Sequence, residues 1–278
     1  MRIAIIARAT EHSPNMADKD AAILECIASE LALSGAKVTT LESGNHIGDF
    51  DAICHMSRST TTLDRLEEAE RRGINVINSP SAVRHCSRIA FIKILQENGI
   101  PQPAFSIVQS MEELDDLPYP AWIKKANGWS SHREDVAYAS TPQEAKDIFA
   151  RMQARGIGRA IHCIHHEGDL IKFYSIGDNW FHYSYPSSGK FGLEAMNSSP
   201  RNIEFETEKL KETARMAAKA MGLTVYGGDC IIATDGSIHI IDINDFPSFS
   251  IVRREAAKEI AKLIVETSQN RIKDERKG

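Results

Sequence analysis

The chain has 278 residues, of which 42% are hydrophobic and 26% are charged, an ordinary composition for a globular protein. A net charge of −5 argues against bulk nucleic-acid binding, and no apolar run approaches the roughly 18 residues that span a bilayer. Five scattered cysteines without metal-ligand spacing predict reduced thiols in a cytoplasmic protein. We therefore expect a small-molecule substrate and no membrane or nucleic-acid partner, with a homodimer left open.

The first third of the chain alternates between strand and helix patterns. Alternation of this kind predicts a parallel sheet covered by helices. No Gly-x-Gly-x-x-Gly motif follows the first strand, so the pattern does not support a dinucleotide site. The expected strands are 2–7, 37–41, 51–55 and 74–78, and the expected helices are 18–33 and 62–72.

The remaining two thirds mix strands and helices in a less regular order. Ser79 and Pro80 predict the N-cap and first turn of one helix that ends near residue 98, and Thr141 begins a capping box. The charged tail from residue 270 is expected to fray. The other expected strands are 121–125, 136–139, 160–164, 169–176 and 180–185, and the other helices are 142–155, 206–221 and 252–268.

A hairpin near the C-terminus carries the most specific chemical signal. Asp235-Gly236 separates two Ile-rich runs, and this dipeptide predicts a two-residue turn in which both residues have positive φ. A turn centred there places Asp229 directly opposite Asp242, with Asn244 on the same face because side chains alternate along a strand. Like charges placed opposite one another are destabilising unless a cation lies between them, and these hard oxygen ligands suit Mg²⁺.

The segment Asp242-Ile243-Asn244-Asp245-Phe246-Pro247, with Asp229 before it, resembles the metal-binding segment of the ATP-grasp superfamily. The resemblance implies an α/β fold: an N-terminal Rossmann-like pre-ATP-grasp domain (residues 1–85), an α+β lid and hinge (86–175) and a metal-binding subdomain (176–278). Most ligases of the superfamily have Glu at the second acid position, whereas Asp242 is more typical of the inositol phosphate kinases that share the fold.

The same resemblance implies residues that hold the phosphates of ATP. Lys124 is in the place of a phosphate-binding lysine, with Lys125 as the second choice, and a small-residue loop containing Ser130 and Ser131 follows. Consecutive backbone N–H groups in such a loop can cradle phosphate oxygens. Arg88 is where ligases have a phosphate-binding Lys and the inositol phosphate kinases have Arg.

By the same resemblance, the segment that follows strand 160–164 lies at the hinge and holds the adenosine. Cys163 and Ile164 are the expected adenine contacts, and Glu167 is the expected ribose contact. The segment also contains His162, His165 and His166, but a strand-to-turn segment need not bring three imidazoles together as a metal site.

Three further residues are expected to serve catalysis. Lys172 is a charge in an apolar strand, and such a lysine is rarely buried unless it is paired; in the superfamily this position faces the transferred phosphate or the acceptor. His132 follows Ser131, as in the Ser-His pair that serves the substrate in the kinases. Arg254, beside Arg253, starts the last helix directly after the metal segment and is predicted to hold an anionic acceptor, with a solvated first turn of the helix as the alternative.

Two irregular segments, Ser13–Asn15 and Ser187–Lys190, are predicted as substrate-contacting loops, with ordinary surface turns as the alternative. The expected activity is transfer of the ATP γ-phosphoryl group with two Mg²⁺ ions, or with Mn²⁺ in their place. A carboxylate–amine ligase acting through an acylphosphate is the main prediction. A hydroxyl kinase of the inositol phosphate kinase type is the alternative, and a non-catalytic ATP-binding protein is the third.

Overall fold

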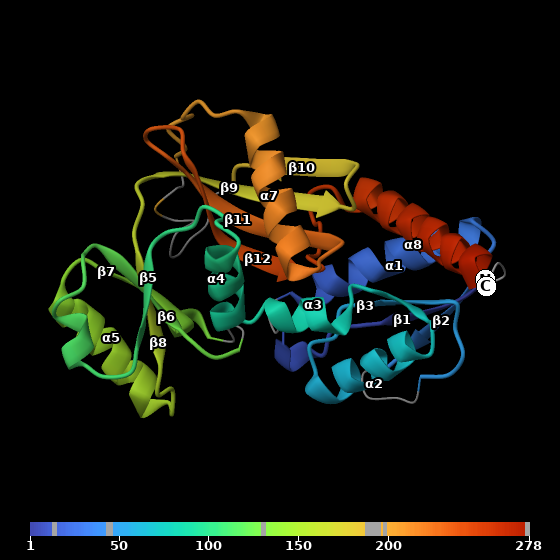
Figure 1. The fold of residues 1–278 in the computed structure, drawn as a ribbon, viewed down its shortest axis with the longest axis horizontal. Helices are drawn as coiled ribbons and strands as arrows, with labels where there is room; N and C mark the ends of the chain where they lie inside the picture. The colour runs from blue at the N-terminus through green and yellow to red at the C-terminus, as the bar shows by residue number, and fades with distance from the viewer. Residues whose placement is uncertain (13–15, 43–46, 129–131, 187–195, 197–198, 276–278) are drawn as a thin grey trace.

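Three four-stranded sheets form the framework of the protein (Figure 1). They are seen in a computed structural model that describes residues 1–12, 16–42, 47–128, 132–186, 196 and 199–275. In these ranges every helix is too short or too polar to span a bilayer. All five cysteines are free thiols, as predicted.

The N-terminal sheet is parallel and has the strand order β2-β1-β3-β4. Ile3 and Ile5 face one side, which α1 and α8 cover, while Ala4 and Ile6 face the other side, which α2 covers. The predicted alternation is therefore confirmed. The elements are β1 (Arg2–Ile6), η1 (Thr10–His12), α1 (Ala17–Leu33), β2 (Lys37–Leu41), β3 (Ala52–His55), α2 (Thr60–Arg71) and β4 (Asn75–Ile77).

The single helix predicted from Pro80 to residue 98 is wrong, because the structure has two helices here: α3 (Pro80–His85) and α4 (Arg88–Glu97). Ser87 adopts an extended conformation (φ −65°, ψ 139°), which ends one helix and makes Ser87 the N-cap residue of the next. As a consequence, Arg88 begins α4, and its side chain donates to the carbonyl oxygen of Lys125 (2.7 Å).

The lid sheet is antiparallel and has the order β5-β8-β6-β7. Helix α5 begins at the predicted cap, where Thr141 accepts from the backbone N–H of Glu144, and it covers one face of the sheet around Ile123 and Phe149. The elements are β5 (Phe105–Val108), η2 (Glu112–Leu114), β6 (Ala121–Lys125), η3 (Arg133–Asp135), β7 (Val136–Ala139), α5 (Pro142–Ala154) and β8 (Ala160–Ile164).

The third sheet, which we call the base sheet, is antiparallel and has the order β10-β9-β11-β12. Helices α7 and α4 cover one face of this sheet. The apolar side of α8 packs in the same hydrophobic core as the N-terminal sheet and residues Ile176 and Val225 of the base sheet. The elements are β9 (Gly168–Ile176), β10 (Trp180–Ser184), α7 (Thr207–Met221), β11 (Val225–Ala233), β12 (Ile238–Asp245) and α8 (Arg253–Glu275).

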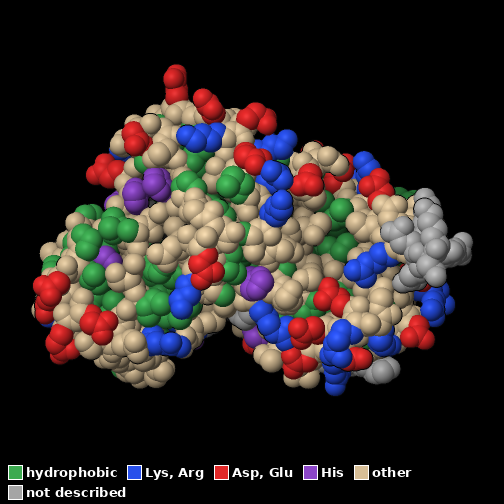
Figure 2. Space-filling view, viewed as in Figure 1, with side chains coloured by type: hydrophobic (Ala, Val, Ile, Leu, Met, Phe, Trp, Pro, Cys, Tyr) green, Lys and Arg blue, Asp and Glu red, His purple; other side chains and the backbone are tan. Residues whose placement is uncertain are grey.

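The frayed tail predicted from residue 270 is wrong for residues 270–275, which belong to α8. Arg271 explains the difference, because its guanidinium donates to the carbonyl oxygens of Gly73 (3.3 Å) and Ile74 (3.1 Å) and so ties the last turns to the N-terminal sheet. On the face drawn in Figure 2, side chains of both charge signs alternate over the outer helices.

Candidate functional site

The hairpin between β11 and β12 brings the two predicted metal-binding acids face to face. Asp229 pairs with Asp242, as predicted, but the turn differs from the expected one. Its loop has three residues, Thr234–Gly236, closed by a hydrogen bond from the Gly236 N–H to the Ala233 carbonyl (2.8 Å), and of the two predicted turn residues only Gly236 has positive φ (+79°). This is the type I turn plus a left-handed residue that is common in hairpins.

A β-bulge restores the pairing that the longer loop would have lost. Close to the turn, Cys230 pairs with Ile240, and this register alone would set Asp229 opposite Ile241. The extra residue in β12 lies between these pairs and moves Asp242 into place. The correct outcome therefore depends on two deviations that cancel, neither of which the sequence analysis predicts.

The acids belong to a row of charged side chains that crosses three strands. Lys172 on β9 pairs with Asp229 on β11, which pairs with Asp242 on β12. The Lys172 ammonium lies 3.1 Å from Asp229 Oδ1, and both side chains are about a quarter exposed. Asn244 follows on the same face and donates from Nδ2 to Asp242 Oδ2 (3.0 Å).

This arrangement fits a divalent cation. Directly opposed carboxylates have Cβ atoms about 4.5–5.5 Å apart, so their oxygens converge, and carboxylate plus amide oxygens are a donor set for Mg²⁺. The salt bridge to Lys172 offsets one of the two negative charges. Asp229, Asp242 and Asn244 are thus the residues that could hold the metal of a nucleotide.

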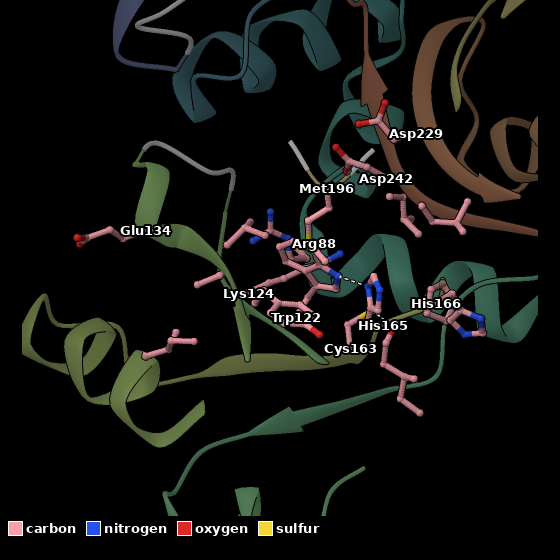
Figure 3. A pocket seen from close by; sticks show the side chains of 18 of the residues that line it. Arg88, Trp122, Lys124, Glu134, Cys163, His165, His166, Met196, Asp229 and Asp242 are labelled. Atoms are coloured by element: carbon pink, nitrogen blue, oxygen red, sulfur yellow. Dashed lines mark hydrogen bonds between the residues drawn. The ribbon is translucent and has the colours of Figure 1, made fainter. Parts of the chain in front are cut away.

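The two acids lie at one end of a cavity of about 920 Å³ between the base sheet and the lid sheet (Figure 3). Lys124 lines the same cavity from the lid strand β6, and Arg88 lines it from the start of α4. Burial lowers the pKa of the Arg88 guanidinium from its ordinary value, and the nearby charges of Asp242 and Asp135 oppose that shift. The cavity therefore combines two carboxylates on the base with one cation on the lid and one on α4, a charge arrangement that suits the phosphates and metal of a nucleotide.

The other part of the cavity is aromatic and apolar. The predicted adenine contacts Cys163 and Ile164 line it, and so do Trp122 and His165, which the sequence analysis does not predict. The indole N–H of Trp122 donates to His165 Nδ1 (3.1 Å). Trp122 lies two residues before Lys124 on β6, so its place on the cavity face follows from strand alternation and was available as a signal.

The three histidines of the hinge point to different partners. His162 contacts the carbonyl oxygen of Pro118 through Nε2 (2.9 Å), His165 accepts from Trp122, and the His166 ring lies 4.3 Å from that of His239. Burial is the main cause that lowers the pKa of each of the three imidazoles. Among the described residues, no group of three or more His, Cys, Asp or Glu side chains could hold a metal ion.

Several predicted site residues lie away from the cavity lining. Glu167 is largely exposed and pairs with Arg201 (3.3 Å), Arg254 is exposed in the first turn of α8, and His132 is exposed at the start of η3. Ser130 and Ser131 lie outside the described residues, as do the loops 13–15 and 187–190. The roles expected for these residues remain predictions.

Solved structures with a similar fold are ATP-grasp ligases. The D-alanine–D-alanine ligase from Bacillus anthracis has a TM-score of 0.74 at 16% identity and covers 99% of both chains. The RimK domain ATP-grasp protein from Sphaerobacter thermophilus has a TM-score of 0.69 at 15% identity, over 95% of this chain and 100% of that chain. The predicted ATP-grasp fold is confirmed.

Curated relatives extend the comparison to sequence. A probable alpha-L-glutamate ligase from Teredinibacter turnerae is 23% identical over 295 residues, covering 96% of this chain and 94% of its own length. Another, from Chromohalobacter salexigens, is 24% identical over 249 residues, covering 84% and 81%. No protein-family model matches the chain. The relatives support the predicted ligase and not the kinase alternative.

Proposed function

With the ATP-grasp fold as the premise, we propose that this protein is a Mg²⁺-dependent carboxylate–amine ligase that forms an amide through an acylphosphate. The observation that carries the proposal is the row Lys172–Asp229–Asp242 on the base sheet, whose two acids share one cavity with Arg88 and Lys124. Transfer of a phosphoryl group is catalysed mainly by positioning and charge stabilisation. This row and the facing cations supply both.

Asp229, Asp242 and Asn244 would hold the metal, and we propose two Mg²⁺ ions for which Mn²⁺ can substitute. When bound, the ions would supply charge neutralisation on the β- and γ-phosphates. The side chains themselves determine where those phosphates lie. Lys124 on the lid strand β6 and Arg88 at the start of α4 would bind phosphate oxygens. Lys172, which lies beside Asp229, would face the transferred group.

The bond changes follow from this placement. A carboxylate oxygen of the substrate attacks the γ-phosphorus, and the bond from that phosphorus to the ADP oxygen breaks. The amine nitrogen then attacks the acyl carbon, the amide C–N bond forms, and inorganic phosphate leaves with the carboxylate oxygen. The amine releases its proton to solvent or buffer. Lys172 compensates the negative charge that develops in both steps.

Two curated relatives are named glutamate ligases, and this supports a proposal about the substrate. We propose that L-glutamate is one of the two substrates, with a second amino acid or peptide as its partner. The cavity end beside Asp242 is where that carboxylate would meet the γ-phosphate.

An isotope experiment tests the reaction class. The protein is incubated with ATP, Mg²⁺, L-glutamate labelled with ¹⁸O in its carboxylates, and a mixture of amino acids and peptides. A ligase that activates glutamate gives ADP, inorganic phosphate containing one ¹⁸O atom, and an amide; if glutamate is the amine, label placed in its partner moves instead. Formation of ADP and a phosphorylated alcohol, without release of inorganic phosphate, would show that the protein is a kinase. No turnover with any mixture would refute the proposal.

A further inference from the structure

A buried carboxylate directly follows the predicted metal-binding amide. Asp245 is the last residue of β12 and only 1% exposed. Arg58, which follows β3 in the N-terminal domain, binds it: Nε lies 2.8 Å and Nη2 lies 2.5 Å from Asp245 Oδ1. The two residues are 187 positions apart. The contact therefore joins the N-terminal sheet to the β11–β12 hairpin that carries Asp229 and Asp242.

The same guanidinium reaches one residue further toward the site. Nη2 of Arg58 lies 3.5 Å from Oδ1 of Asn244, and Nδ2 of Asn244 donates to Asp242 Oδ2 (3.0 Å). A continuous chain of hydrogen bonds thus runs from Arg58 through Asn244 to Asp242. The weak contact from Arg58 uses one of the two lone pairs of Asn244 Oδ1, and the hydrogen bond from Asn244 is made to Asp242 Oδ2, so Oδ1 of Asp242 takes no part in this chain of contacts.

A second arginine of the N-terminal domain holds the backbone at this point. Arg8 follows β1, and its Nη2 donates to the carbonyl oxygens of Asp245 (3.0 Å) and Phe246 (3.1 Å). Its Nη1 donates to Asp20 on α1 (3.3 Å). Phe246 has φ +46°, which is uncommon for a residue with a large side chain. Arg8 therefore binds the backbone directly after β12, where Phe246 has a strained positive φ.

Stability alone does not account for these contacts. Burying an arginine carries a large desolvation cost, and a buried ion pair is often no more stabilising than apolar side chains of similar volume. Arg58 is 7% exposed, as is Arg8. A planar guanidinium can contact two neighbouring acceptors in a defined geometry, which a lysine ammonium does less well. The contact of Arg58 with Asn244 thereby fixes the orientation of the Asn244 amide, which in turn donates to Asp242.

We propose that Arg58 is a positioning residue that orients Asn244 and Asp242 for Mg²⁺–nucleotide binding, so that the N-terminal domain completes the metal site. The inference rests on the proposed function, because it assumes that the hairpin holds a nucleotide-bound metal. Groups that orient metal ligands typically change metal affinity or activity by about 10–100-fold when they are replaced.

The test is a titration of the intact protein with Mn²⁺ in the presence of ADP, with free Mn²⁺ measured by electron paramagnetic resonance. Arg58→Lys keeps the charge beside Asp245 but loses the planar fork. We expect this variant to bind Mn²⁺ about 10-fold more weakly or worse, with unchanged affinity for metal-free ADP. Unchanged Mn²⁺ affinity in a folded Arg58→Lys protein would overturn the proposal.

The matched control is Arg84→Lys. Arg84 also belongs to the N-terminal half and also pairs with an aspartate, Asp64 (2.5 Å), but this pair is on the surface. We expect wild-type Mn²⁺ affinity from this control. An equal loss in Arg84→Lys would show a general effect of arginine replacement and would also overturn the proposal.

A double variant separates positioning from folding. Arg58→Met combined with Asp245→Leu removes the buried pair without leaving one charge uncompensated. We expect a folded protein, by its circular dichroism, with Mn²⁺ affinity as weak as that of Arg58→Lys; wild-type affinity would contradict the inference. Failure of the wild-type protein itself to bind Mn²⁺–ADP would instead refute the proposed function.

Discussion

The base sheet and the lid sheet line one cavity with different kinds of groups. On the base, Asp229 and Asp242 line the cavity, and Lys172 lies beside Asp229; the three residues occupy paired positions on three strands, so their spacing is set by backbone hydrogen bonds. On the lid, Lys124 and Trp122 alternate with core residues along one strand that packs on α5. The base thus presents charges at fixed spacing, to which the proposed function assigns the chemistry. The lid presents a cation and an aromatic side chain, to which it assigns nucleotide binding.

This contrast predicts that base substitutions act on catalysis and lid substitutions act on nucleotide affinity. The strongest test is Asp242→Ala. Loss of the metal ligand removes several kcal/mol of charge stabilisation, and we expect turnover to fall by at least about 10³-fold. The measurement is ADP release at saturating ATP and Mg²⁺.

The control for this substitution is Asp235→Ala at the tip of the same hairpin, where the carboxylate is exposed and accepts from the Ser237 N–H (2.9 Å). It should retain wild-type turnover. Asp242→Ala should also preserve the melting temperature, because it removes a like-charge pair with Asp229. Normal turnover in Asp242→Ala would contradict the assignment of the metal site.

Lys172→Met should have the next largest effect. The ammonium lies beside Asp229, and under the proposed function it stabilises charge on the transferred phosphoryl group, so we expect kcat to fall by about 10²–10³-fold. The KM for ATP should change much less, because Lys124 and Arg88, the proposed phosphate ligands, are unchanged. Steady-state kinetics separates the two, and a rise in KM with unchanged kcat would place Lys172 with the binding groups instead.

On the lid, Lys124→Met and Lys125→Met form a matched pair. Lys124 lines the cavity, whereas the Lys125 ammonium lies 4.0 Å from the buried Asp135. Loss of a charge-assisted contact of about 1.5–3 kcal/mol should raise the KM for ATP by about 10–100-fold in Lys124→Met. Lys125→Met should bind ATP normally; the reverse order would make Lys125 the phosphate ligand.

Trp122→Leu tests the apolar part of the lid. Loss of aromatic stacking costs about 1–3 kcal/mol, so we expect the KM for ATP to rise about 10-fold with kcat retained. Trp122→Phe keeps an aromatic ring but removes the hydrogen bond to His165. Its KM for ATP should lie between those of Trp122→Leu and the wild-type protein. Equal KM values for wild type and both variants would contradict the prediction that Trp122 contacts the adenine of ATP.

The smallest effect concerns pH and the lid alone. Burial lowers the pKa of His162 in the folded protein below its ordinary value near 6.5. The unfolded chain therefore takes up a proton first as pH falls, and stability decreases from about pH 6.5 downward. His162→Gln, which can still donate to Pro118, should show a smaller loss of melting temperature between pH 7.5 and 5.5; an identical loss would exclude His162 as a cause.

Local sequence patterns were enough for much of the fold and for the centre of the site. Alternating strands and helices predicted the parallel sheet, and the hairpin dipeptide led to the pairing of Asp229 with Asp242. The helix break at Ser87 was not predictable, because no Gly or interior Pro marks it. The bulge at Ile241 was equally hidden, since an extra residue in a strand leaves no periodic signal when the run is Ile-rich throughout.

Residue types and their spacing along the chain were therefore sufficient to predict the two facing acids, to single out Lys172 and to propose the kind of ion that the acids suit. Which distant groups reach those acids depended on how the sheets pack together. Arg58 and Arg8 meet Asp245 because the carboxyl ends of two parallel strands abut the end of β12. Contacts across such separations follow from the burial of apolar faces on both sheets, and no local pattern encodes them.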